Sequence, residues 1–181
     1  MSDCTRFHVI TGGPGSGKTS LIDALARAGH AHTVEAGRAI IQDQLAIDGP
    51  ALPWRDPQAF AELMLSWELR SYRMAEAMSG PVFFDRSVTD LLGYLTLIGR
   101  PVPAHIARAA ARFRYNQRVF VAPPWPEIYA QDAERKQTLE EAVRTYEALV
   151  TAYAACGYEL VSLPLVSVEE RVRFVLDTIA E

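Results

Sequence analysis

The sequence predicts an α/β fold of three layers, in which a mainly parallel β-sheet of five strands is covered by helices on both faces. Two observations predict this fold. Short apolar runs typical of buried strands alternate with longer stretches of helical periodicity. In addition, a glycine-rich segment at residues 12–19 joins the first strand directly to the first helix. The length of 181 residues, of which 49% are hydrophobic, fits one domain over residues 1–181.

The chain opens with a strand, a glycine-rich loop and a helix. Residues 7–11 form a short apolar run that ends in glycines. Leu21, Ile22 and Leu25 then recur at helical spacing until Gly29, a residue that commonly ends helices. This order of strand, loop and helix is the first βα unit of the expected sheet.

The next segment contributes two further strands. Residues 33–35 give a weaker signal for the second strand, and a helix follows from Ala36 to a turn-forming segment at residues 48–50. A long helix over residues 57–78 begins after a favourable Asp-Pro pair. Residues 82–84 then form a buried apolar run, which indicates the third strand.

The second half repeats the alternation. Three prolines within residues 123–126 interrupt regular structure after the fourth strand, so a loop is expected there. Capping boxes at Thr138 and Ser167 mark the starts of the last two helices. The expected elements are helices at 89–98, 103–114 and 138–156, strands at 119–122 and 158–163, and a final helix from 167.

Composition and charge restrict the class of function. The net charge of −4 repels polyanions, so we expect no nucleic-acid partner, and any phosphate must be bound by locally arranged donors. The two cysteines show neither CxxC spacing nor neighbouring histidines, which argues against disulfides and zinc. No secretory signal and no run of 18 apolar residues is visible. We therefore expect a soluble, cytoplasmic protein without a membrane partner, and the sequence leaves open a homo-oligomer.

The glycine-rich loop is the most specific motif in the sequence. It matches the pattern GxxxxGK followed by Ser or Thr, between a predicted strand and a predicted helix. Backbone N–H groups of such a P-loop surround phosphate oxygens, Lys18 reaches the β- and γ-phosphates, and Thr19 binds Mg²⁺. A simple turn would need neither Lys nor Thr. The expected nucleotide-binding residues are Gly12, Gly13, Pro14, Gly15, Ser16, Gly17, Lys18, Thr19 and Ser20.

Charged side chains follow two other predicted strands. Asp85 ends the third strand, where a carboxylate holds Mg²⁺ in many P-loop proteins, and Arg86 beside it suits a phosphate group. The alternative for Asp85 is a cap on the following helix together with Ser87. Glu35 follows the second strand and is our candidate general base, with Arg38 on the same helical face as a further substrate-binding residue. The alternative for Glu35 is a carboxylate favoured by the helix dipole.

The segment after the fourth strand has the features of a lid. Residues 123–137 combine prolines with Asp132, Arg135 and Lys136, charged residues suited to a loop that closes over phosphates and excludes water. A plain surface loop is the alternative. Trp125 in this segment is either a packing residue or a stacking platform for a base or another ligand.

With these residues assembled, the chain resembles P-loop kinases that act on nucleosides and nucleotides. It resembles more closely a family of ATPases or kinases often called the AAA domain family, which includes the ribosylnicotinamide kinase domain of bacterial NAD regulators. The resemblance rests on the P-loop and on residues 35–38, 84–87, 123–136 and 158–181. It implies the sheet order 2-3-1-4-5, Glu35 as base, an Asp85–Arg86 pair at the phosphates, and Arg135 as a lid arginine.

Two functions are consistent with these residues. The first is transfer of the γ-phosphoryl group of ATP, with Mg²⁺, to a small-molecule, nucleoside-like acceptor. The second is an ATPase or nucleotide-dependent switch that acts through a protein partner. The sequence lacks an NKxD or TKxD guanine-reading motif, which favours ATP over GTP. It identifies neither the acceptor nor the oligomeric state.

Overall fold

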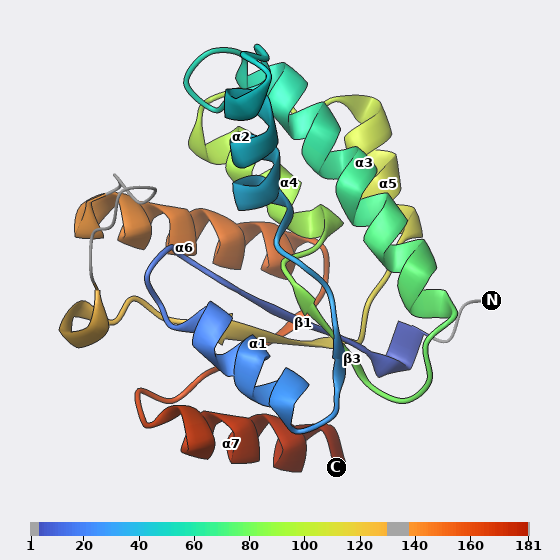
Figure 1. Ribbon diagram of the computed structural model, residues 1–181, viewed down its shortest axis with the longest axis vertical. Helices are drawn as coiled ribbons and strands as arrows, with labels where there is room; N and C mark the ends of the chain where they lie inside the picture. Colours follow the sequence, from blue (N-terminus) through green and yellow to red (C-terminus); the bar gives the residue numbers. More distant parts are fainter. Residues whose placement is uncertain (1–3, 130–137, 181) are drawn as a thin grey trace.

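The computed structural model describes residues 4–129 and 138–180, and these residues form one five-stranded sheet between two layers of helices (Figure 1). The strands are β1 (Phe7–Gly12), β2 (Ala31–His32), β3 (Val82–Asp85), β4 (Arg118–Ala122) and β5 (Glu159–Ser162). All pairings are parallel, in the order β2-β3-β1-β4-β5. The predicted α/β fold and sheet order are therefore confirmed.

The helices fall into two groups around the sheet. The helices are α1 (Lys18–Arg27), α2 (Ala36–Ala46), α3 (Pro57–Glu76), α4 (Val88–Leu97), α5 (Ala104–Arg112), α6 (Leu139–Ala155) and α7 (Val168–Ala180), with short 3-10 turns at η1 (Cys4–Arg6) and η2 (Pro126–Ile128). In Figure 1, α1 and α7 lie below the sheet, whereas α6 and the α2–α5 group lie above it. In the described part of the chain, no helix combines the length and apolar character needed to cross a membrane.

Alternation along the strands creates the two cores. Phe7, Val9 and Phe84 pack with Tyr72 of α3 and Tyr153 of α6 on one face. On the other face, a second cluster contains Ile10, Phe83, Phe120, Leu21 and Val175, and thus joins the sheet to α1 and α7. Because successive strand residues point to opposite faces, a strand buried on both faces is largely apolar.

The second strand lies earlier than the sequence predicted. Residues 33–35 were expected to form it, but β2 is Ala31–His32, which pairs with Val82 and Phe83. The Thr33 N–H still donates to the Phe83 carbonyl, at 2.9 Å. Beyond this bond the chain leaves the sheet, and Glu35 takes the N-cap position of α2. Apolar character alone did not reveal this short edge strand, because edge strands can be brief and half polar.

The predicted capping boxes are confirmed at both later helices. The Thr138 N–H donates to Glu141 Oε2 at 2.6 Å, and the Glu141 N–H donates to Thr138 Oγ1 at 3.2 Å. Ser167 and Glu170 make the same reciprocal pair at the start of α7. These caps satisfy N–H groups that lack partners within the helix. They fix where α7 starts, and therefore where its first turn meets the P-loop.

Candidate functional site

The P-loop connects β1 to α1 at the carboxyl edge of the sheet. Gly15 has a φ of +74°, and a Cβ at this position would lie 2.5 Å from the Tyr129 ring, so glycine is required there. Gly17 precedes α1 without a side-chain cap, which leaves the positive end of this helix facing the loop. This is the arrangement in which backbone N–H groups bind phosphate.

Lys18 is buried inside the loop. Its ammonium group donates to the Gly13 carbonyl at 2.7 Å and to Ser16 Oγ at 3.4 Å. Burial, together with the positive charge of Arg86, lowers the pKa of Lys18 to about 8, although nearby carboxylates oppose the shift. A bound anion would favour the charged form of this lysine.

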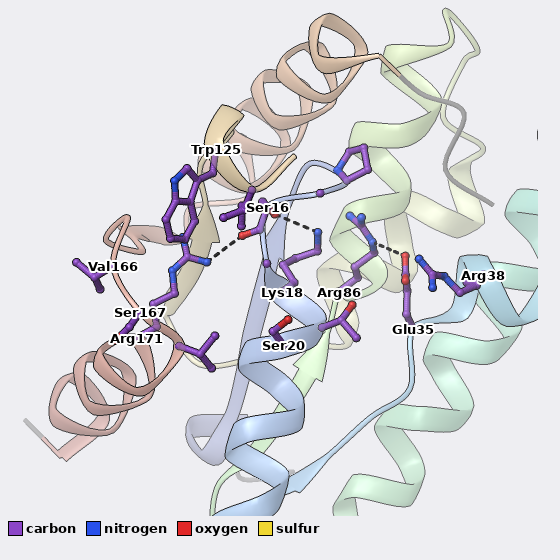
Figure 2. A pocket seen from close by; sticks show the side chains of 16 residues that line it. Ser16, Lys18, Ser20, Glu35, Arg38, Arg86, Trp125, Val166, Ser167 and Arg171 are labelled. Carbon is purple, nitrogen blue, oxygen red and sulfur yellow. Dashed lines mark hydrogen bonds and ion pairs between the residues drawn. The ribbon is translucent and has the colours of Figure 1, made fainter. Parts of the chain in front are cut away.

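A hollow of about 460 Å³ extends over the P-loop (Figure 2). It lies between Trp125 and Arg171 on one side and Glu35 and Arg38 on the other, with Lys18 between them. Its lining includes predicted residues from separate parts of the chain: Pro14, Gly15, Ser16, Gly17, Lys18, Thr19, Ser20, Glu35, Arg38 and Arg86. The structure thus brings together the P-loop, the start of α2 and the end of β3.

Glu35 and Arg86 form an ion pair on the wall of this hollow. Arg86 Nε lies 3.2 Å from Glu35 Oε1, and both side chains are mostly buried. Burial alone would raise the pKa of Glu35, but the charges of Arg86 and Lys18 outweigh it and hold that pKa below its ordinary value. The Glu35 carboxylate is therefore ionised at neutral pH.

Asp90 on α4 pairs with the other side of the Arg86 guanidinium, and it was not among the site residues predicted from the sequence. Asp90 Oδ1 accepts from Arg86 Nη1 at 3.2 Å and from Thr11 Oγ1 at 2.5 Å. Its Oδ2 accepts from the Ser87 N–H at 2.9 Å and from the Tyr153 hydroxyl. One buried carboxylate thus connects β1, α4 and α6 to Arg86.

The capping pattern held a signal for Asp90. Ser87 and Asp90 form a capping box at the start of α4, with an acidic residue three positions after Ser. Ser87 caps this helix, as the alternative reading of Asp85 had it, but Asp90 rather than Asp85 completes the cap. Asp85 keeps its carboxylate for another role.

Asp85 and Thr19 line a second, adjoining hollow of about 230 Å³, which also contacts Glu35 and Arg38. Within the described residues, buried Asp85 Oδ1 has no hydrogen-bond partner. Burial and the nearby charge of Glu35 raise the pKa of Asp85 to about 6, against the opposing charge of Lys18. Carboxylate and hydroxyl groups are the oxygen ligands that Mg²⁺ prefers, and both residues line one hollow, so they fit the predicted metal.

The remaining predicted lid residues are only partly described. Trp125 lies on the hollow, but Asp132, Arg135 and Lys136 lie outside the described residues. Arg171 of α7 also lines the hollow, and the sequence analysis did not single it out. No local pattern could have identified it, because its contact with Ser16 spans 155 residues of sequence.

The sheet order, the P-loop between β1 and α1, and the charged residues at the strand ends define a class of protein: a P-loop protein with a nucleotide kinase-like fold. A family model described as AAA domain matches residues 7–171. The chain belongs to this family. A search of curated protein sequences gives no significant match.

Solved structures share this fold at low sequence identity. NadR protein in complex with NR has a TM-score of 0.70 and 18% identity, with coverage of 98% of this chain and 52% of that chain. This chain therefore spans about half the length of NadR. A thymidylate kinase from Ehrlichia chaffeensis has a TM-score of 0.67 and 12% identity, with coverage of 98% and 99%. A deoxyadenosine kinase from M. mycoides with bound dATP has a TM-score of 0.58 and 10% identity, with coverage of 97% and 100%.

Proposed function

We propose that the protein is an ATP-dependent phosphotransferase that moves the γ-phosphoryl group to a hydroxyl of a small, nucleoside-like acceptor. One observation carries this proposal: the Glu35–Arg86 ion pair lies on the same hollow as Lys18 and Thr19 of the P-loop. A carboxylate and a guanidinium at that position suit an acceptor hydroxyl and the phosphoryl group it attacks. A hydrolase would use such a carboxylate to orient water, so the acceptor test below separates the two functions.

The donor nucleotide binds along the P-loop in this proposal. Loop N–H groups and Lys18 hold the β- and γ-phosphates, with Gly12 to Ser20 as the binding segment. Thr19 and Asp85 hold Mg²⁺, which supplies positive charge at the phosphates when bound. The chain carries a net charge of −4, which by itself repels phosphate. The affinity for phosphate therefore comes from this local arrangement of donors.

The acceptor binds on the Glu35 side of the hollow. Its hydroxyl oxygen forms a bond to the γ-phosphorus while the hydroxyl proton passes to the Glu35 carboxylate. The bond between the γ-phosphorus and the bridging oxygen breaks, and ADP leaves with the electron pair. Arg86 neutralises charge on the transferred group, Arg38 contacts the acceptor, and Arg135 of the lid segment 123–137 completes the phosphate contacts.

The nucleoside-like acceptor is supported by the names of the structural neighbours. Two of them are a deoxyadenosine kinase and a thymidylate kinase, and NadR was solved with NR. All three carry the same fold at low identity, so the chemistry is carried over here as a proposal.

The test is phosphate transfer to defined acceptors. The protein is incubated with ATP, Mg²⁺ and a panel of nucleosides, nucleotides, vitamins and sugars, and phosphorylated products are detected by mass spectrometry. We expect one acceptor class to be phosphorylated, Lys18→Ala to abolish the product, and Glu35→Gln to lower turnover about 100-fold or more while nucleotide affinity stays near normal.

The matched control is Glu62→Gln, which changes an exposed carboxylate on α3 and should leave turnover unchanged. An unchanged rate in Glu35→Gln would remove Glu35 as the base. If no acceptor is modified while a protein partner accelerates ATP hydrolysis, the protein is a nucleotide-dependent switch and the phosphotransferase proposal fails.

A further inference from the structure

Arg171 is a buried arginine that joins three separate parts of the candidate site. It lies on the first turn of α7 with 1% of its surface exposed. Its Nη1 donates to the Ser16 carbonyl at 2.8 Å, and its Nε donates to the Pro164 carbonyl at 2.8 Å. Its guanidinium carbon lies 4.6 Å from the centre of the Trp125 ring. The P-loop, the β5–α7 connection and the segment after β4 therefore meet at one cation.

The charge of Arg171 lacks a carboxylate partner in the part of the chain that the structure describes. Its Nη2 is buried and has no hydrogen-bond partner among the same residues. Burial lowers the pKa of Arg171 below its ordinary value, yet a guanidinium remains charged at physiological pH. Two carbonyl hydrogen bonds and the Trp125 ring stabilise this buried charge in place of a carboxylate, and a nearby anion would stabilise it further.

The hollow beside Arg171 is where such an anion would lie. Arg171 lines the hollow of about 460 Å³ together with the P-loop, and Figure 2 shows its guanidinium between Trp125 and Ser16. A Cβ at Gly17 would lie 3.1 Å from Arg171 Nη1, so the guanidinium packs directly against the phosphate loop. Arg171 thus borders the same cavity as the predicted triphosphate.

The bond to Ser16 also controls which way the loop backbone faces. In a P-loop the N–H groups point inward at phosphate, so carbonyl groups of the loop must point away from it. Arg171 serves this purpose at Ser16, because its Nη1 donates to the Ser16 carbonyl at 2.8 Å and so fixes the direction of that carbonyl. Lys18 and Ser16 Oγ meanwhile hold the Gly13 carbonyl, at 2.7 and 2.8 Å.

We propose that Arg171 is a positioning residue for the phosphate loop, that Trp125 covers it, and that its charge favours a polyphosphate in the hollow. This inference rests on the proposed nucleotide site and adds to it a residue from the far end of the chain. Arg171 acts through its hydrogen bond to the Ser16 carbonyl and through the electrostatic potential of its charge. The P-loop, not Arg171, contacts the phosphates directly. The quantity that Arg171 affects is the affinity for the polyphosphate portion of the nucleotide, independent of the base.

Binding of ATP and of inorganic tripolyphosphate tests this proposal. Both affinities are measured by calorimetry for the wild type, Arg171→Met and Arg171→Lys, with thermal unfolding of each variant recorded alongside. We expect Arg171→Met to weaken both ligands by about 10- to 100-fold, because a hydrogen bond from a charged group is lost. Arg171→Lys keeps the charge and loses the planar fork, so it should restore part of the affinity.

The matched control is Arg173→Met, which removes an exposed arginine two residues further along α7 and should leave both affinities unchanged. Equal affinities in Arg171→Met and the wild type would overturn the proposal. A lower binding stoichiometry at unchanged affinity would also overturn it, because that result reports a misfolded fraction alone. If Arg171→Met does not fold, Trp125→Leu at the half-buried loop is expected to weaken both ligands, and unchanged binding there contradicts the role.

These outcomes separate this inference from the proposed function. If the wild type binds both ligands and Arg171→Met weakens them, the inference holds even where no acceptor is phosphorylated. If the wild type phosphorylates an acceptor while Arg171→Met binds both ligands normally, only the inference fails. If the wild type binds neither ligand, both fail.

Discussion

Arg86 combines an unusual backbone with a fixed side chain. Its φ of +72° lies in the left-handed region, which a residue with a Cβ rarely adopts and which costs about 1–3 kcal/mol. The Arg86 N–H donates to the Ile10 carbonyl at 3.1 Å, and the side chain pairs with Glu35 and Asp90. Burial lowers the pKa of this guanidinium, but the two carboxylates raise it by more, so the net shift of the pKa is upward. The ion pairs with Glu35 and Asp90 thus hold Arg86 at the hollow despite its strained backbone.

Lys18 gives the site a pH dependence whose direction follows from its surroundings. Without ligand, its pKa of about 8 lies below the ordinary value, so the ammonium group loses its proton as the pH rises through about 8. A bound triphosphate favours the charged form and raises this pKa. ATP should therefore bind more weakly above about pH 8, with uptake of protons on binding in that range.

The measurement is ATP calorimetry between about pH 7 and pH 9.5 in buffers with different ionisation enthalpies. Lys18→Arg serves as the comparison, since a guanidinium keeps its charge throughout this range, and its residual binding should show no proton uptake. Proton uptake of equal size in both proteins would show that another group titrates, and would contradict the role assigned to Lys18.

Some of these residues could be predicted from sequence and others could not. Asp85 and Arg86 were predictable because the carboxyl ends of parallel strands meet at one edge, and the apolar run of β3 shows where that strand ends. Glu35 also lies at this edge, although β2 ends earlier than predicted. Asp90 could be read as a helix cap, but its bonds to Thr11 and Tyr153 cross 79 and 63 residues and depend on packing. Arg171 has no local signal at all, because only the completed fold brings α7 to the P-loop.

At the scale of elements, α4 and α6 pack closely through Gly93. A Cβ at Gly93 would lie 2.9 Å from Leu149 Cδ2, 3.2 Å from the Leu149 Cα and 3.3 Å from the Ala148 carbonyl oxygen. The last two atoms belong to the backbone of α6 and cannot rotate away. This close approach places Asp90 of α4 against Tyr153 of α6, and therefore links helix packing to the position of Arg86.

We expect Gly93→Ala to lower the free energy of unfolding by about 1–3 kcal/mol, because the helices must separate by a few tenths of an ångström. This loss should exceed the gain in helix propensity, which is at most about 1 kcal/mol. Gly37→Ala in α2 is the matched control, since the nearest atom there is the Phe60 ring at 3.8 Å. The control should be neutral or slightly stabilising in urea denaturation. A Gly93→Ala protein as stable as the control would show that α4 and α6 tolerate a wider spacing.

The elements were more predictable than their packing. Periodicity, capping boxes and turn-forming residues located α1 to α7 to within a few residues, because these signals are local, whereas the 3-10 turn η2 was not predicted. The two-residue β2 lies earlier than predicted, because an edge strand so short carries little apolar pattern. The closeness of α4 and α6 was not predicted, because a single glycine in an apolar helix does not show which element approaches it.

Across the whole molecule, the hollow crosses the carboxyl ends of β1, β3 and β4. Gly12 ends β1, Asp85 ends β3 and Ala122 ends β4, and the residues that follow these strands face the hollow. In Figure 1, α7 lies on one side of the sheet and α2 and α3 on the other. The Arg171 end and the Glu35 end of the hollow therefore come from opposite layers, which suits a donor and an acceptor that meet over the P-loop.

The proposed function requires that this hollow binds a magnesium-bound nucleoside triphosphate, and calorimetry with ATP and Mg²⁺ tests this requirement most directly. We predict saturable binding of one ATP per chain by the wild type, weakened by about 100-fold or more in Lys18→Ala, because a buried charge-assisted contact to phosphate is lost. Absence of binding by the folded wild type, or equal binding by Lys18→Ala, would contradict the account.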